Sequence, residues 1–93
     1  MTVNICGVTH NIKYKQDHFD TDLHLGRIDY AKAEIVINAD AVSTIQHEAL
    51  CHEITHGILV HIGRDDLSCD ETFVQSLANA IAQTFTVRLE DCP

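Results

Sequence analysis

Apolar and polar residues alternate along the first forty positions, as they do in β-strands with one buried face. The alternation predicts a hairpin made of Val3–Cys6 and Val8–Tyr14, which turns at Gly7. Two further strands are predicted at Gly26–Tyr30 and Ala33–Asn38, joined by a tight turn. The last of these is rich in β-branched residues and is the clearest strand of the chain.

A helical spacing of apolar residues replaces this alternation after the fourth strand. We predict that Asp40 or Ser43 caps a first helix, because short polar side chains accept hydrogen bonds from the free amides at helix starts. The helix is expected to run to about Ile62 and to stop at Gly63, because glycine favours the backbone conformation that ends helices.

A second helix follows, with a more regular apolar pattern at every fourth residue: Phe73, Leu77, Ile81 and Phe85. Ser68–Glu71 forms a capping-box sequence at its start. Together these elements predict an α+β fold, in which a short antiparallel sheet of three to four N-terminal strands packs on two C-terminal helices. No repeat or linker divides the chain, so its 93 residues predict one domain over residues 1–93.

The composition adds expectations about compartment and partners. The N-terminus lacks the cationic and apolar segments of a signal peptide, and no stretch approaches the roughly 20 apolar residues of a membrane span. We therefore expect a cytoplasmic protein without a membrane partner, whose cysteines are free thiols: Cys6, Cys51, Cys69 and Cys92. The net charge is −8 and the six basic residues are scattered, which argues against a nucleic-acid partner.

The candidate chemistry lies in the middle of the first predicted helix, at His52-Glu53-Ile54-Thr55-His56. Histidines four positions apart project from one face of a helix and can hold one metal ion. Glu53 follows the first ligand directly and can take a proton from a metal-bound water. A zinc ion lowers the pKa of such a water toward about 7 and polarises a carbonyl group. The motif therefore predicts one zinc ion per chain, with Glu53 as a general base.

A catalytic zinc site needs a third protein ligand and one position left for water. Glu71 is our prediction, because it stands at the start of the second helix, which can pack antiparallel to the first. Two alternatives stay open. Glu71 can instead close the capping box with Ser68, and Asp70 can replace it as the ligand, because predicted element boundaries are uncertain by about two to four residues.

Two other groups imitate metal sites. His61 lies about 180° around the helix from His52 at 100° per residue, and the motif that uses a third histidine requires glycine where this chain has Leu59. We therefore interpret His61 as a surface histidine. The polar, acidic segment 16–25 carries Asp20, Asp22 and His24 at alternate positions. It lacks the glycine and glutamate of a calcium-binding loop, so we interpret it as a solvated loop.

The chain resembles a known family at this point. The runs Leu50–Leu59 and Asp70–Asn79 are similar to small phage and prophage zinc metallopeptidases, minimal relatives of the ImmA/IrrE-like endopeptidases within the gluzincin group. Gly26–Tyr30 and the strand through Ile35–Ile37 fit the same pattern. The resemblance covers roughly residues 26 to 85 and is more specific in the helices than in the strands.

This resemblance implies a minimal zincin-like architecture, with zinc held by His52, His56 and Glu71 and with Glu53 as the general base. It also implies that the strand before the active-site helix is an edge strand that pairs with extended substrate. That strand is Ala33–Asn38, which gives the candidate substrate-binding residues Ile35, Val36 and Ile37. No oxyanion donor is clearly placed, and the candidates for that role are Tyr30, Tyr14 and His61.

The predicted function is zinc-dependent hydrolysis of a peptide bond in a protein or peptide substrate, in the cytoplasm of the host cell if the chain is phage-encoded. The residues themselves support hydrolytic zinc chemistry, whereas the peptide bond rests on the resemblance. The alternative is a zinc-stabilised protein-interaction module with little or no turnover. A third interpretation is an acidic partner-binding protein without a metal. The sequence leaves the oligomeric state open.

Overall fold

The computed structural model describes residues 1–16 and 25–91. Its elements, in chain order, are β1 Thr2–Ile5, β2 Val8–Lys15, β3 Gly26–Asp29, β4 Glu34–Asn38, α1 Ser43–His61, α2 Asp65–Ser68, α3 Glu71–Thr84 and β5 Leu89–Glu90. The predicted α+β class is confirmed. Residues 17–24 of the predicted acidic loop, with Asp20, Asp22 and His24, fall outside the described residues, as does Cys92.

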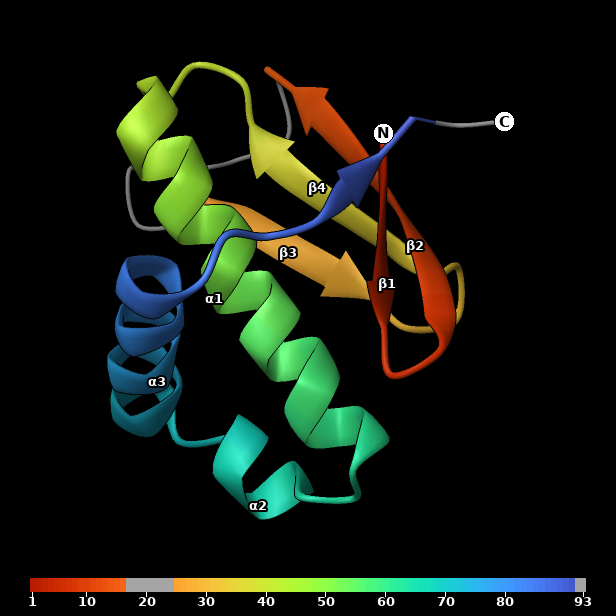
Figure 1. Ribbon diagram of the computed structural model, residues 1–93, viewed down its shortest axis with the longest axis vertical. Coiled ribbons are helices and arrows are strands. Elements are labelled where there is room, and N and C mark those ends of the chain that lie inside the picture. The colour runs from red at the N-terminus through yellow and green to blue at the C-terminus, as the bar shows by residue number, and fades with distance from the viewer. Residues whose placement is uncertain (17–24, 92–93) are drawn as a thin grey trace.

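The strands form one mixed sheet in the order β3-β4-β2-β1-β5 (Figure 1). Both predicted hairpins are present, since β1 pairs antiparallel with β2 and β3 pairs antiparallel with β4. The prediction of a wholly antiparallel sheet of three to four strands is wrong, because β2 and β4 run parallel where the two hairpins meet. The fifth strand comes from the C-terminal segment, where Leu89 pairs with Val3. Two residues are too few to show an alternating pattern.

The prediction that Ala33–Asn38 is an edge strand is also wrong. Strand β4 is paired on both sides, with β2 and with β3, so its backbone is not available to a substrate. Its three central side chains are buried, at 0% exposure for Ile35, 2% for Val36 and 0% for Ile37. A strand that is buried on both faces reads as a continuous apolar run. The three predicted substrate-binding residues therefore belong to the interior, and β3 is the edge strand at this side of the sheet.

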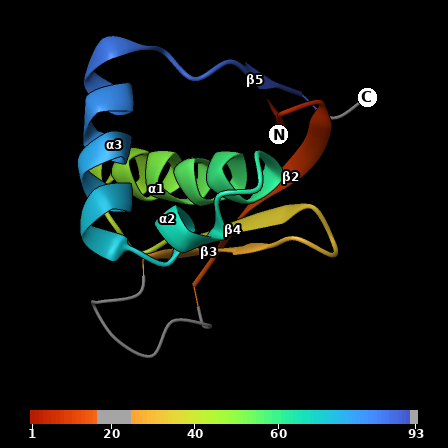
Figure 2. The same ribbon diagram turned by 90° about the horizontal axis from the view of Figure 1, so that it is seen from below.

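Helix α1 is the middle layer of the fold, with the sheet on one side and α3 on the other (Figure 2). The core joins Ile5, Ile35 and Ile37 of the sheet to Leu50 and Ile54 of α1. Because α1 is covered on several sides, its apolar residues lie at mixed helical spacings. In the part of the chain that the structure describes, no helix has the length and apolar character that crossing a membrane requires.

The predicted N-terminal cap of α1 is wrong, whereas the predicted end of the helix is confirmed. The N-cap residue is Val42, without a side-chain cap, so neither Asp40 nor Ser43 caps the helix. Instead the Gln46 amide donates to the carbonyl oxygens of Asn38 and Ala39 and ties the first turn to the preceding loop. At the other end Gly63 has a φ of 81°, and its N–H donates to the Val60 carbonyl oxygen.

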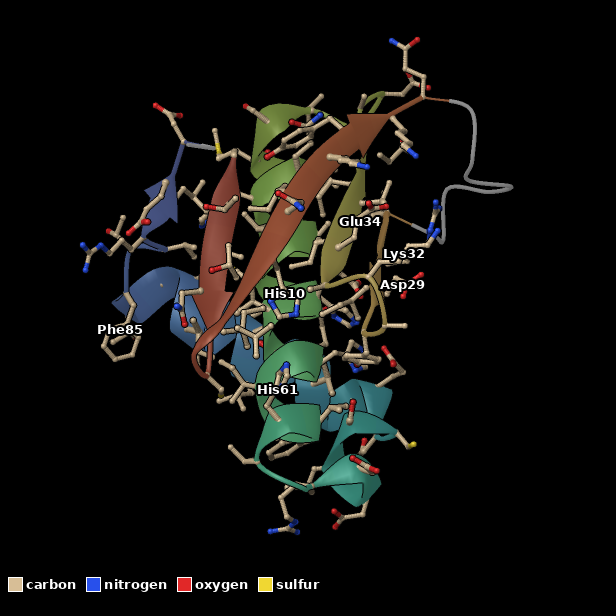
Figure 3. All side chains as sticks on the ribbon, turned by 90° about the vertical axis from the view of Figure 1, so that its right-hand side faces the viewer. His10, Asp29, Lys32, Glu34, His61 and Phe85 are labelled. Carbon is tan, nitrogen blue, oxygen red and sulfur yellow. The ribbon has the colours of Figure 1, made fainter. Side chains whose placement is uncertain are left out.

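Helix α3 begins differently from the prediction. Asp70 is its N-cap and accepts a hydrogen bond from Phe73 N–H at 3.1 Å, so Ser68 does not form a capping box with Glu71. The buried residues of α3 are Val74 and Ala78. By contrast, Phe85 follows the helix at 66% exposure and points outward in Figure 3. The regular apolar pattern therefore identified the helix correctly but extends beyond the face that packs on α1.

Candidate metal centre

Three potential metal ligands meet where the start of α3 faces the middle of α1. The Nε2 atoms of His52 and His56 are 3.2 Å apart, because residues one helical turn apart share a face. The Glu71 carboxylate reaches both rings, with one oxygen 3.0 Å from His52 Nε2 and the other 3.0 Å from His56 Nε2. Within residues 1–16 and 25–91 this is the one group of three such side chains close enough to share a metal ion.

The structure distinguishes the two carboxylates that the sequence leaves open. Asp70 precedes α3 and uses its side chain to cap the helix at Phe73 N–H. Glu71 is the first residue of the helix and points toward His52 and His56. The short helix α2, which sequence analysis missed, occupies the connection between α1 and α3. It ends at Ser68, three residues before Glu71.

Each histidine is also held on its far side by a hydrogen bond. His52 Nδ1 lies 2.8 Å from Gln75 Oε1, and His56 Nδ1 lies 2.9 Å from Ser68 Oγ. With Nδ1–H donating to these oxygens, each neutral ring presents the lone pair of Nε2 to the centre of the group. Sequence analysis did not identify either partner. Gln75 stands four residues after Glu71 and so shares its helix face, which was the available signal.

The donor set fits a zinc ion. Two imidazole lone pairs and a carboxylate converge, and this concentration of acceptors needs a cation or an added proton between them. Zinc bonds of about 2.0–2.2 Å in a tetrahedral arrangement separate neighbouring ligand atoms by about 3.3 Å. The distances of 3.0 and 3.2 Å between these atoms are close to that value. Three protein ligands of this kind leave a fourth position for water or substrate.

Glu53 lies beside the ligands and is only 7% exposed. Burial raises its pKa to about 7; the neighbouring His52 opposes this rise and Glu71 adds to it. Burial lowers the pKa of His56, and Glu71 opposes this effect. The lowered pKa favours the neutral ring, which is the form that binds a metal. A carboxyl group whose pKa is near neutral can both accept and release a proton at physiological pH.

These side chains line one cavity of about 620 Å³ between β3, α1 and α3. Of the three candidate oxyanion donors, only Tyr30 lines it. Burial raises the pKa of Tyr30, and a hydrogen bond to Ser68 opposes that rise. His61 lies elsewhere, with its ring centroid 5.7 Å from that of His10 (Figure 3). Its exposure agrees with the interpretation as a surface histidine.

Comparison with known proteins gives no match: no family model, no curated protein and no solved structure is significantly similar to this chain. The resemblance to the ImmA/IrrE-like endopeptidases therefore stays a prediction from the sequence motifs. What the fold and the site define is an α+β domain that carries a cavity with a possible histidine and glutamate metal centre.

Proposed function

We propose that this chain is a zinc-dependent peptidase that uses Glu53 as a general base. The observation that carries the proposal is the convergence of His52, His56 and Glu71 at 3.0–3.2 Å in the cavity that also holds the buried Glu53. Three protein ligands and an adjacent carboxylate of raised pKa are the parts that metal-assisted hydrolysis requires.

The roles of the residues follow from their positions. When bound, zinc supplies a Lewis acid that polarises the carbonyl group and acidifies the attacking water. Glu53 accepts a proton from that water as its oxygen attacks the carbonyl carbon, and then delivers the proton to the nitrogen that leaves. Water and one peptide bond are thus converted into a carboxylic acid, which keeps the second proton of the water, and an amine. The hydroxyl of Tyr30, in the same cavity, donates a hydrogen bond to the oxygen that gains negative charge.

Strand β3 offers the backbone that an extended substrate needs. Asn38 N–H donates to the Leu25 carbonyl oxygen, so the alternation of the antiparallel ladder turns the backbone groups of Gly26 and Ile28 away from β4. Both residues line the cavity. In the described part of the chain no strand pairs with this outer edge. A substrate strand added there would pass directly beside the metal ligands.

The wider context rests on the sequence resemblance. We propose a minimal zincin-like architecture related to the ImmA/IrrE-like endopeptidases, a phage or prophage origin, and action in the cytoplasm. A site on so small a scaffold, next to an edge strand, suits a segment of a protein substrate better than a small molecule enclosed on all sides.

A zinc-stabilised interaction module is the second candidate function, and one observation favours it. Of the residues of helix α3, only Val74 and Ala78 are fully buried, and its other apolar residues are half-buried or exposed. A metal held by His52 and His56 of α1 and by Glu71 of α3 would fasten the two helices together and contribute to folding free energy.

Two measurements separate these functions. Zinc content of the purified protein is measured first, and about one ion per chain is expected. Wild-type protein and Glu53→Gln are then each added to a cell lysate, and new protein N-termini are quantified by mass spectrometry. Wild-type-specific N-termini, with zinc retained in both proteins, support the peptidase. Equal N-termini in zinc-loaded samples would overturn it in favour of the interaction module, and native protein that binds no zinc would overturn both.

A further inference from the structure

Helix α3 carries three polar side chains at intervals of one turn on the face toward α1. Glu71 reaches His52 and His56. Gln75, four residues later, places its Oε1 2.8 Å from His52 Nδ1. Asn79, four residues later again, accepts a hydrogen bond from Gln75 Nε2 at 2.8 Å. A continuous chain of hydrogen bonds therefore runs from the His52 ring along α3.

We propose that Gln75, held by Asn79, is the positioning residue that presents His52 Nε2 to the metal. This inference rests on the zinc-binding part of the proposed function and concerns how that site is built. His52 can ligate a metal through Nε2 only if its proton sits on Nδ1 and its ring keeps the orientation found here. Gln75 Oε1 is an acceptor only, so it selects the Nδ1–H form and holds the ring in place.

Asn79 is needed because a glutamine amide can present either its oxygen or its NH₂ group. In the arrangement found here the Gln75 NH₂ group donates to Asn79 Oδ1. Turning the amide over would bring NH₂ against the Nδ1–H of His52 and the oxygen against the Asn79 acceptor. With the Asn79 amide in the orientation found here, both hydrogen bonds would be lost together, so Asn79 favours the arrangement in which Gln75 Oε1 faces the histidine.

The two ligands of α1 are supported from different elements. His56 is held through Nδ1 by Ser68 at the end of α2, whereas His52 depends on α3. Helix α3 thus supplies a ligand of its own and orients a ligand of the other helix. Packing of α3 on α1 therefore completes the site. It gives a role to Glu71, Gln75 and Asn79, which face α1 but remain exposed to solvent.

Zinc affinity, measured by competition with a chromophoric chelator, tests this role without relying on hydrolysis. Gln75→Leu removes the acceptor and is expected to raise the zinc dissociation constant about 10- to 100-fold. Gln75→Glu keeps an acceptor oxygen at the same place and is expected to restore affinity to within a few-fold of wild type. Gln83→Leu is the matched control, since it makes the same substitution on the same helix without touching His52, and it is expected to leave affinity unchanged.

A second readout follows the ring itself. In the metal-free protein the Glu71 carboxylate lies 3.0 Å from His52 Nε2 and favours a proton there, in competition with Gln75 at Nδ1. Nitrogen-15 NMR of the metal-free protein, at a pH where His52 is neutral, is therefore expected to show the same fraction of the Nδ1–H tautomer in wild type and in Gln83→Leu. Gln75→Leu is expected to shift the population toward Nε2–H, and Asn79→Ala to shift it in the same direction. A merely structural role of Gln75 would change thermal stability without changing the tautomer.

The outcomes separate this inference from the proposed function. Zinc binding by wild type with an unchanged affinity and tautomer in Gln75→Leu would overturn the role of Gln75 and leave the peptidase proposal standing. Failure of wild type to bind zinc would overturn the proposed function, while the NMR comparison in the metal-free protein would still decide whether Gln75 selects the His52 tautomer.

Discussion

Gly26 of β3 lies directly against Glu53 of α1. A β-carbon at Gly26 would come within 3.3 Å of Glu53 Cγ and within 3.1 Å of Ile37 Cδ1. The absence of a side chain at Gly26 therefore makes the room in which the candidate general base stands. This contact connects the edge strand, the interior of the sheet and the chemistry of the site.

Substitution of Gly26 by Ala is expected to displace Glu53 and to destabilise the fold by about 1–3 kcal/mol through overpacking. Hydrolysis should fall further than the loss of folded protein explains. Gly57→Ala is the control, because the three atoms nearest to a β-carbon there belong to Ile5 and Ile28, at 3.1–3.4 Å, whereas Glu53 is among the nearest neighbours at Gly26. Urea unfolding of both variants measures the loss of stability, and their cleavage rates measure the loss of hydrolysis. Equal specific activity per folded molecule in the two variants would contradict it.

The buried Glu53 carboxyl predicts a pH dependence of stability in the metal-free protein. Its pKa rises from 4.5 to about 7 on folding, so between these values the folded state binds more protons than the unfolded state. Stability therefore falls as pH rises through this range, and above it the penalty is on the order of 3 kcal/mol at about 1.36 kcal/mol per pKa unit.

Glu53→Gln removes this penalty. The variant should match wild type near pH 4 and become more stable than wild type as the pH rises to 8, in urea unfolding with a chelator present. Glu48→Gln, an exposed glutamate on the same helix, serves as the control and should keep the wild-type curve. If the free energy of unfolding had the same pH dependence in wild type and in Glu53→Gln, the buried Glu53 carboxyl would not be its cause.

Adjacent carboxylates at the start of α3 are expected to behave in opposite ways. Asp70→Ala removes the helix cap at Phe73 N–H and should cost about 1 kcal/mol of stability with zinc affinity unchanged. Glu71→Ala removes the proposed third ligand and should weaken zinc binding by roughly 100-fold or more with little change in metal-free stability. Each variant is the control for the other in unfolding and chelator-competition experiments, and the reverse pattern would assign the ligand to Asp70.

The difference between Asp70 and Glu71 illustrates the limit of sequence reasoning about this site. The spacing of His52, Glu53 and His56 within a helix is a local property, and a sequence pattern can carry it. The identity of the proposed third ligand depends on where α3 begins, and a shift of one residue turns the side chain through about 100°. Ser68 and Gln75 became partners of the histidines only through packing of α2 and α3 on α1.

The sheet shows the same division between local and distant information. Both hairpins were predictable because their turns and alternation are adjacent in sequence. The parallel pairing of Ile12 with Ile35 and the pairing of Val3 with Leu89 join distant segments. No local pattern specifies such pairs. Because the pairing with β2 was not foreseen, β4 was wrongly predicted to be an edge strand. Its continuous apolar run at Ile35–Ile37 already indicated burial on both faces.

Tyr30 is expected to act on the reaction and not on metal binding. Tyr30→Phe removes a hydroxyl from the cavity and should lower kcat about 100-fold, while KM and zinc affinity change little because none of the three ligands is lost. Tyr14→Phe is the control, since Tyr14 does not line the cavity. Steady-state kinetics on a substrate whose cleavage requires Glu53 check this. A large loss in zinc affinity with an unchanged kcat would instead indicate that Tyr30 helps to position His56 through its hydrogen bond to Ser68.

The edge of β3 predicts which backbone amides of a substrate matter. Only alternate residues of an added antiparallel strand direct their N–H groups toward Gly26 and Ile28. In a peptide spanning an identified cleavage site, N-methylation of an amide that faces β3 should raise KM about 10-fold, because it removes a backbone hydrogen bond and adds bulk at the pairing edge. N-methylation at the intervening positions, where the amide faces away, should have little effect. A single scan of N-methylated peptides measures both sets, and an effect that shows no alternation along the peptide would exclude strand addition at β3.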